Sequence, residues 1–287
     1  MSARRPVLLL AALWLVAGCS TSTAESEAGD TIAPEPSHQA RNIVLPFDSY
    51  ELSLSDYYTI SDAQDVLARE CMRDRGLEYP VIDRPTDAEE VKNRRRYGVI
   101  EPLVADRLGY HVNEHMPDPY GIAKKEEVRQ AGLAEKEAEA LGDPEVGCSA
   151  LAYKTLVREA DSDVSTDLFN GLGEKIMAES QTEPEVARAL REWSECMSSA
   201  GFDYSNPYEA AGDDRWWKEG GELASKEEVV AARADVRCKQ RVGLVGIWFE
   251  AEKKLQQNAI REHPEYFAEL AAAGQRHIAA AKAVLGR

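Results

Sequence analysis

The chain has 287 residues with 51 acidic and 34 basic side chains, and its formal net charge at pH 7 is −17. This excess of negative charge argues against nucleic-acid binding and against lying flat on an anionic membrane surface. It favours solubility and cationic partners, although acids on solvated helix faces are the simpler explanation of the same charge.

The first eighteen residues predict an export signal. Arg4 and Arg5 form a short positive region, and the apolar run that follows, residues 7–17, is too short to span a bilayer as a helix. The run ends in VAGC, and this string followed by a serine resembles a bacterial lipoprotein processing site. The resemblance implies a signal peptide of residues 1–18 and lipid on Cys19, where two or more acyl chains would give stable anchoring. The alternatives are an ordinary signal peptide with an accidental Cys19, and twin-arginine export instead of the general secretory route.

Residues 19–41 predict a disordered tether. The segment is rich in Ser, Thr, Ala, Glu and Pro, and Ile32 is its one large apolar side chain, so it cannot bury enough surface to offset its ordering entropy.

Loss of residues 1–18 removes two arginines and no acid, which takes the formal charge from −17 to −19. The remaining chain is long enough for one large domain or two small ones.

A nine-residue phrase occurs twice, as CMRDRGLEY from Cys71 and as CMSSAGFDY from Cys196. Each copy is followed by an acid-Val-x-Cys string, which ends at Cys148 in the first copy and at Cys238 in the second. An even number of cysteines in an exported chain predicts disulfides. The duplication favours one bridge in each copy, Cys71–Cys148 and Cys196–Cys238, and leaves the two other connectivities open.

The phrase itself predicts the end of a helix. Apolar residues recur at helical spacing before each copy, with start signals at Ser61 and Thr182, and Gly76 and Gly201 supply the left-handed conformation that ends many helices. The Met beside each Cys, and the Tyr that closes each phrase, then read as core residues. The alternative interpretation is a ligand site made by Met and Tyr.

Further helices are predicted over residues 148–161 and 163–180, and a long helix runs from the capping box at Ser225 to Pro264. An Ala-rich stretch, residues 265–285, is expected to fold back on the long helix, and residues 43–54 alternate weakly and could be extended. The predicted fold class is mainly α, with duplicated disulfide-stapled helical units and a long C-terminal helix or helical hairpin. The predicted units are residues 42–160, which carry an insert, and residues 161–287.

Several strings resemble those of a group of uncharacterised actinobacterial secreted proteins and lipoproteins. They are WSECM followed by GFDYSNP, then EEVVAARADVRCK, and the earlier RRRYGV and LGYH. The resemblance covers most of residues 60–255. It implies an extracytoplasmic location and this architecture, and it transfers no activity and no catalytic residues.

The sequence carries no recognisable catalytic motif. His111 to His115 match His-x-x-Glu-His, but Pro117 and Pro119 leave no room for the long helix that a zinc site of this kind needs. We therefore expect a surface loop without metal. Neither a Gly-x-Ser-x-Gly nucleophile turn nor a Gly-rich phosphate loop is present, so we expect no cofactor and do not favour an enzyme.

Two segments are candidate binding sites. Arg94, Arg95 and Arg96 lie in the insert of the first copy and could clamp a carboxylate or phosphate. The alternative is that they neutralise the acids just upstream, at positions 87, 89 and 90, on one helix.

The second candidate is the pair Trp216 and Trp217, in a polar, Gly-flanked segment between the cysteines of the second copy. Adjacent tryptophans cannot easily both point inward, so one could be a binding platform for a glycan or a protein partner. The alternative is that one or both cover the disulfide.

These patterns together predict a lipid-anchored protein on the extracytoplasmic face of the cell membrane, with a binding or structural role in the envelope. Its partners would be the membrane, through Cys19, and an envelope protein or glycan, with no nucleic acid. The alternative function is a cell-envelope or extracellular hydrolase without a recognisable motif.

Overall fold

The structure is a computed structural model that describes residues 34–89, 91–111, 120–160, 164–217 and 224–287. Every regular element in this part of the chain is helical, which confirms the mainly α fold class. The signal peptide, Cys19 and the tether up to residue 33 lie outside the described residues.

The first-copy half contains α1 (His38–Arg41), the 3-10 helix η2 (Pro46–Tyr50), α2 (Leu54–Asp74), α3 (Pro102–Leu108), α4 (Ile122–Gly132), α5 (Glu135–Gly142) and α6 (Cys148–Ala160). The second-copy half contains α7 (Asp167–Thr182), α8 (Pro184–Ser199), α9 (Pro207–Ala211), α10 (Lys226–Val242), α11 (Leu244–Glu262) and α12 (Pro264–Val284).

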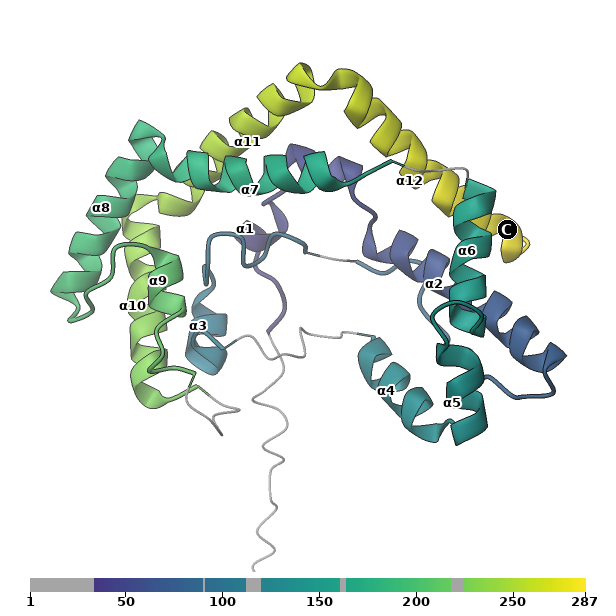
Figure 1. Ribbon diagram of the computed structural model, residues 1–287. Helices are drawn as coiled ribbons and strands as arrows, with labels where there is room; N and C mark the ends of the chain where they lie inside the picture. Colours follow the sequence, from purple (N-terminus) through teal and green to yellow (C-terminus); the bar gives the residue numbers. More distant parts are fainter. Residues whose placement is uncertain (1–33, 90, 112–119, 161–163, 218–223) are drawn as a thin grey trace, which may run out of the picture.

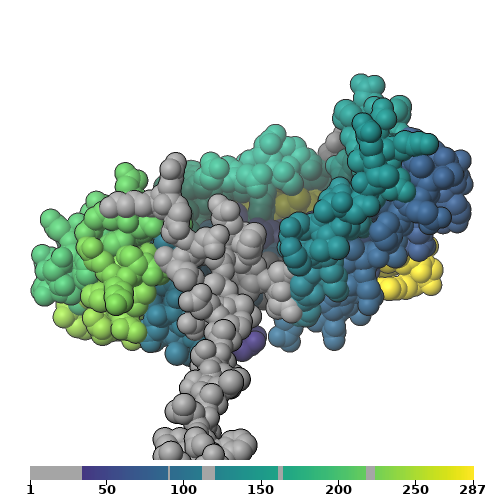
Figure 2. All heavy atoms as spheres, turned by 90° about the horizontal axis from the view of Figure 1, so that it is seen from below, coloured from purple at the N-terminus to yellow at the C-terminus, as the bar shows by residue number. Residues whose placement is uncertain are grey.

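The helices form an arch with two lobes (Figure 1). One lobe, called here the second-copy lobe, contains α3, α8, α9 and α10, and the other, the first-copy lobe, contains α2, α4, α5 and α6. Helices α11 and α12 form the outer span at the top of the view, and α7 runs beneath them between the two lobes. Figure 2 shows the same lobes from below, with green atoms on one side and blue and teal atoms on the other.

The two lobes exchange segments between the halves of the sequence. The buried apolar residues between Tyr97 and Tyr110, in the first half, belong to the largest hydrophobic core of the described residues together with residues of α8 and α10, and α3 packs directly on α10. In return, α12 from the end of the chain packs on α2 and α6. Each half of the sequence therefore buries apolar surface of the other, and the division into units 42–160 and 161–287 stays a prediction.

Each lobe contains one disulfide. Cys71 and Cys148 are joined with a Cα–Cα distance of 5.6 Å, and Cys196 and Cys238 with one of 5.7 Å. These are the two pairs that the duplicated phrase predicts. Each bridge joins the helix that ends in the phrase to a later helix, α2 to α6 and α8 to α10.

The first copy of the phrase ends α2 with paired backbone hydrogen bonds. The Leu77 N–H donates to the Met72 carbonyl at 2.9 Å, and the Gly76 N–H donates to the Arg73 carbonyl at 2.9 Å. Gly76 has a φ of +70°, a conformation that costs other residues energy. This is a Schellman motif, in which the glycine reverses the chain and the next apolar residue returns to the helix.

The second copy repeats this geometry at the end of α8. The Phe202 N–H donates to the Met197 carbonyl at 2.9 Å, the Gly201 N–H donates to the Ser198 carbonyl at 3.0 Å, and Gly201 has a φ of +90°. The Met of both copies is fully buried, and the closing Tyr of both is at least 93% buried. The phrase is thus a structural element, as the helix-end interpretation predicts.

The structure corrects the expected helix starts. Helix α2 begins at Leu54, where Ser53 and Asp56 form the capping box, so Ser61 lies inside the helix. Helix α8 begins at Pro184, and the Thr182 hydroxyl instead donates to the Glu179 carbonyl at 2.8 Å. Because η2 and the start of α2 occupy much of residues 43–54, the expected extended segment there is also wrong.

Two further expectations about the chain ends need correction. The long helix from the Ser225 capping box is interrupted at Gly243, whose φ of +68° divides it into α10 and α11. After Pro264, α12 leaves α11 and packs on the first-copy lobe instead of folding back along α11. At the other end, residues 34–41 of the expected tether are described, and they include α1.

The Schellman glycines provide a stability test. Gly201→Ala should lower the free energy of unfolding by about 1 kcal/mol, because a Cβ there would meet no atom within 4 Å but the left-handed backbone would be strained. Gly171→Ala is the matched control in the interior of α7, where the same added methyl group should raise stability by about 0.8 kcal/mol. Urea unfolding followed by circular dichroism measures both changes, and equal effects of the same sign would contradict the assignment.

Candidate functional site

An open groove of about 1100 Å³ lies between α7 and the chain segment that runs from η2 into α2. The wall from α7 is a stripe at helical spacing, made by Asn170, Gly173, Glu174, Met177, Ala178 and Gln181. The opposite wall consists of Glu51, Leu52, Ser53, Leu54 and Tyr57. Buried side chains line its base, namely Leu45, Phe47, Phe169 and Gln256, and polar residues complete it, namely Asp48, Lys92, Asn93 and Arg96.

The composition of α7 makes room for this groove. Gly173 and Ala178 lie on the face that lines it, and their small size keeps the space between α7 and the opposite wall open. Gly171 and Gly173 weaken the helix intrinsically, yet the helix forms because Phe169 and Ile176 pack into a core with Phe267 of α12. The glycine that costs helix stability therefore contributes to the shape of the site.

Two of the three consecutive arginines bond inside the protein, away from the groove. The Arg94 Nε donates to the Glu101 carboxylate at 2.6 Å, and Arg95 donates to the Tyr110 carbonyl at 2.9 Å. Burial, and then the charge of Arg94, lower the pKa of Arg95 to about 10. Neither arginine is available as a clamp for an external anion.

The third arginine, Arg96, lines the groove and binds a carboxylate of the chain itself. Both its Nε and one terminal nitrogen donate to Glu252, which is fully buried in α11. The expected bidentate clamp thus exists, but its anion is internal. Within the described residues the carboxylate partners of the arginines are Glu101 and Glu252, and neither Asp87 nor Glu89 pairs with them, whereas position 90 of the alternative pairing lies outside the described residues.

Glu252 collects further hydrogen bonds beneath the groove. The Tyr97 hydroxyl donates to it at 2.9 Å, and Gln256 donates its amide N–H at 3.0 Å. The Gln256 amide oxygen in turn accepts from the Phe47 N–H at 2.9 Å. This network joins the insert, α11 and η2, and so it builds the base of the groove.

Of the two adjacent tryptophans, Trp216 lies in the core and Trp217 lies at the surface. Trp216 is only 4% exposed, donates its indole N–H to the Ala210 carbonyl at 2.7 Å, and shares the core cluster that contains Cys196 and Cys238. It cannot be a binding platform. Trp217 is 48% exposed, and its ring stacks on His111 at 4.7 Å. Neither tryptophan lines the groove.

The His-x-x-Glu-His string begins at a structural histidine. The Nδ1 atom of His111 lies 2.7 Å from the Glu228 carboxylate, and the N–H groups of Tyr110 and His111 also donate to that carboxylate. The remaining positions of the string, 112–115, lie outside the described residues. Among the residues that are described, no cluster of three His, Cys, Asp or Glu side chains could hold a metal ion.

Sequence reasoning missed two buried charged clusters. In the second-copy lobe, the Lys239 ammonium lies 2.9 Å from the Asp235 carboxylate, which also accepts from the Trp193 indole N–H at 2.9 Å. Burial raises the pKa of Asp235 and lowers that of Lys239. In the first-copy lobe, a second cluster joins α2, α4 and the chain between them through Asp62, Asp65, Arg84, Glu126 and Arg129.

Four of the five charged side chains that line the groove, Asp48, Glu51, Lys92 and Arg96, already have partners. Lys92 pairs with Glu51 at 2.9 Å, and Asp48 accepts from the Asn93 amide at 2.7 Å. Glu174 has no ion-pair partner within the described residues. The Ser53 hydroxyl of the opposite wall donates to the Asp56 carboxylate at 2.6 Å, as part of the α2 capping box.

None of the helices described here is long and apolar enough to cross a membrane. Comparison of the chain with protein-family models, with curated proteins and with solved structures found no match. The resemblance to actinobacterial secreted proteins and lipoproteins therefore stays a prediction, and the function must be argued from the groove.

The Arg96–Glu252 pair makes a stability prediction. Arg96→Met should lower the free energy of unfolding by about 3 kcal/mol, because it leaves a fully buried carboxylate without its cation. Arg188→Met is the control, since Arg188 forms only surface pairs on α8 and its loss should cost less than about 0.5 kcal/mol. Chemical denaturation of both variants measures the difference. Equal stabilities would show that Glu252 does not depend on Arg96.

Proposed function

We propose that this protein is a lipid-anchored, extracytoplasmic binding module whose groove receives an extended polypeptide segment of an envelope partner. The observation that carries the proposal is the open groove between α7 and residues 45–57, with apolar, amide and charged groups along both walls. Small-molecule sites are usually enclosed and mostly apolar, whereas peptide grooves are open and alternate apolar contacts with hydrogen-bonding groups.

The length of the groove suits a short peptide. The stripe from Asn170 to Gln181 extends about 16 Å along α7 at about 1.5 Å per residue. An extended chain covers about 3.3 Å per residue, so about five residues of a partner fit along this wall. Partly exposed Leu52 and Tyr57 on the opposite wall offer apolar contacts for alternate side chains of such a segment.

The charge of the groove favours a basic residue in the partner. Lys92 and Arg96 are already paired with carboxylates, and Glu174 is the acid of the α7 wall that such a residue could meet. The strongly acidic composition of the chain would assist the approach of a cationic segment.

Contacts of Pro34 and Ser37, near the end of the expected tether, support the proposed anchor. The Arg94 guanidinium donates to the Pro34 carbonyl at 2.5 Å, and the Ser37 N–H donates to the Glu101 carboxylate at 2.5 Å. The end of the tether is thereby attached to the same insert that lines the groove. Lipid on Cys19 would then hold the groove within reach of partners at the membrane surface.

A matched pair of glycine variants tests the groove. Gly173→Gln places a side chain in the groove, while Gly171→Gln adds the same side chain to α7 at a position that does not line it. Peptides enriched on the wild-type protein from a displayed random library should carry a basic residue. We expect them to bind the Gly173→Gln variant at least about tenfold more weakly and the Gly171→Gln variant unchanged. Absence of enrichment, or equal binding by all three proteins, would contradict the proposal.

The lipid anchor has its own test. Cells that express the protein and are fed an alkyne-tagged fatty acid should label the wild-type chain and the Thr21→Ala variant, but not Cys19→Ala, because Cys19 is the proposed acceptor of lipid. Covalent label is measured after removal of free lipid. Retention of label by Cys19→Ala would overturn the anchoring part of the proposal and leave the groove untouched.

A further inference from the structure

The two disulfides differ in their access to solvent, although the duplicated phrase makes them look equivalent. Cys71 is partly buried at the edge of a small core cluster, while its partner Cys148 is fully buried. In the other bridge both cysteines lie inside the large core, with Cys196 at 7% and Cys238 at 2% exposure. Cys71 is therefore the most exposed of the four disulfide-bonded cysteines, and the one that a reagent can approach most easily.

The inner cysteines also differ in their place on the helix. Cys148 is the first residue of α6, a helix of 13 residues, whereas Cys238 lies well inside α10, which runs from 226 to 242. At a helix N-terminus the unpaired N–H groups and the helix dipole stabilise a thiolate. Cys148 is therefore a better leaving group than Cys238.

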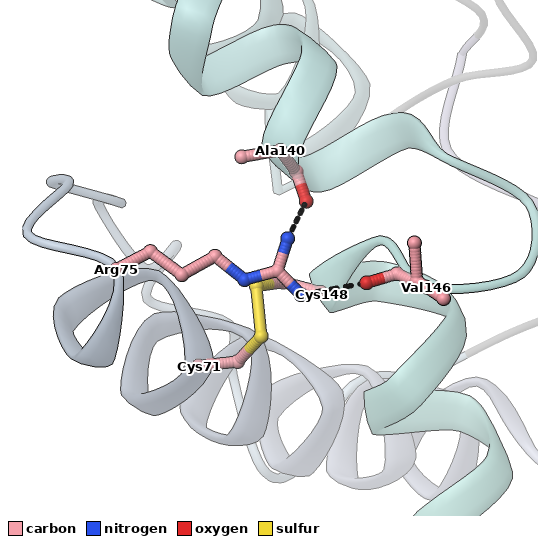
Figure 3. The surroundings of a disulfide bond; sticks show 5 residues. All are labelled: Cys71, Arg75, Ala140, Val146 and Cys148. Carbon is pink, nitrogen blue, oxygen red and sulfur yellow. Dashed lines mark hydrogen bonds between the residues drawn. A yellow bond between two sulfur atoms is a disulfide. The ribbon is translucent and has the colours of Figure 1, made fainter.

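A fixed cation distinguishes the first bridge further. Arg75 follows Cys71 by one helical turn, and its guanidinium donates to the Ala140 carbonyl at 3.3 Å and to the Val146 carbonyl at 2.6 Å. These bonds hold the guanidinium beside the Cys71–Cys148 bridge (Figure 3). The corresponding residue in the second copy is Ala200, so the Cys196–Cys238 bridge has no such group in this position.

We propose that the Cys71–Cys148 bridge is a thiol–disulfide exchange site that accepts electrons from a dithiol reductant while the protein stays folded. The Cys196–Cys238 bridge is by contrast purely structural. This inference is independent of the groove and of the lipid anchor.

The exchange would proceed in two steps. A thiolate of the reductant attacks the Cys71 sulfur, the bond to Cys148 breaks, and Cys148 leaves as a thiolate at the N-terminus of α6. The second thiol of the reductant then attacks its own sulfur in the mixed disulfide and releases Cys71. Two electrons pass to the protein, the reductant becomes a disulfide, and its two protons end on the two cysteines.

The first test compares the two bridges in the native full-length chain. Dithiothreitol is added without denaturant, free thiols are alkylated at intervals, and mass spectrometry follows the four cysteine peptides. Cys71 and Cys148 should become alkylated at least about tenfold faster than Cys196 and Cys238. Equal rates, which reduction through global unfolding would give, would overturn the proposal.

The second test locates the attack. Brief treatment with glutathione, followed by acid quenching, should leave glutathione on the Cys71 peptide and a free thiol on the Cys148 peptide. Glutathione on Cys148 would contradict the assignment of Cys71 as the attacked sulfur.

The third test separates the charge of Arg75 from its structural bonds. If its charge stabilises the departing thiolate, Arg75→Gln should slow the reduction by dithiothreitol about threefold or more, and Arg75→Lys should restore part of the rate. If Arg75 only holds the neighbouring loop, its loss would loosen the site and speed the reaction, which would refute this role. Arg69→Gln removes an exposed arginine from the same helix and is the control.

Discussion

The arrangement of the arch depends on the hydrogen bonds and the ion pair that the buried carboxylate of Glu252 accepts. Arg96 and Tyr97 reach it from the insert of the first half, while Gln256 connects it to the backbone of η2. Burial of a charged group costs free energy unless several strong hydrogen bonds or an ion pair offset that cost. Because the bonds from Arg96 and Tyr97 come from about 155 positions away in the sequence, the carboxylate constrains where the insert and α11 meet, and the groove is built on that contact.

Local signals explain why much of the fold was predictable. The Schellman ends at Gly76 and Gly201 depend only on a few neighbouring residues, so the repeated phrase specified them correctly. The cysteine pairs followed from the same repeat. The break at Gly243 was missed, because a glycine in a long apolar pattern can be either tolerated or used as a helix end, and only packing decides.

The site was less predictable, since its partners are distant in the sequence. Nothing local indicates that Arg96 pairs with Glu252, or that Trp216 faces inward and Trp217 outward. One signal could have been used: Asp235 and Lys239 lie four positions apart on the same face of α10 as buried alanines. Charged residues within an apolar helix face indicate a buried pair. The acid-Val-x-Cys string contains Asp235 but does not include Lys239, so the motif alone does not indicate this pair.

The exchange of segments has a consequence for the order in which the chain can fold. Helix α12 is made last, yet it covers α2 and α6, which belong to the first half. During synthesis the apolar surface of α2 and α6 that α12 covers therefore stays exposed until α12 has emerged. Both cysteines of the Cys71–Cys148 bridge, which are 77 positions apart, precede α12 in the chain, so a covalent bond can hold α2 and α6 together during the interval in which packing by α12 cannot.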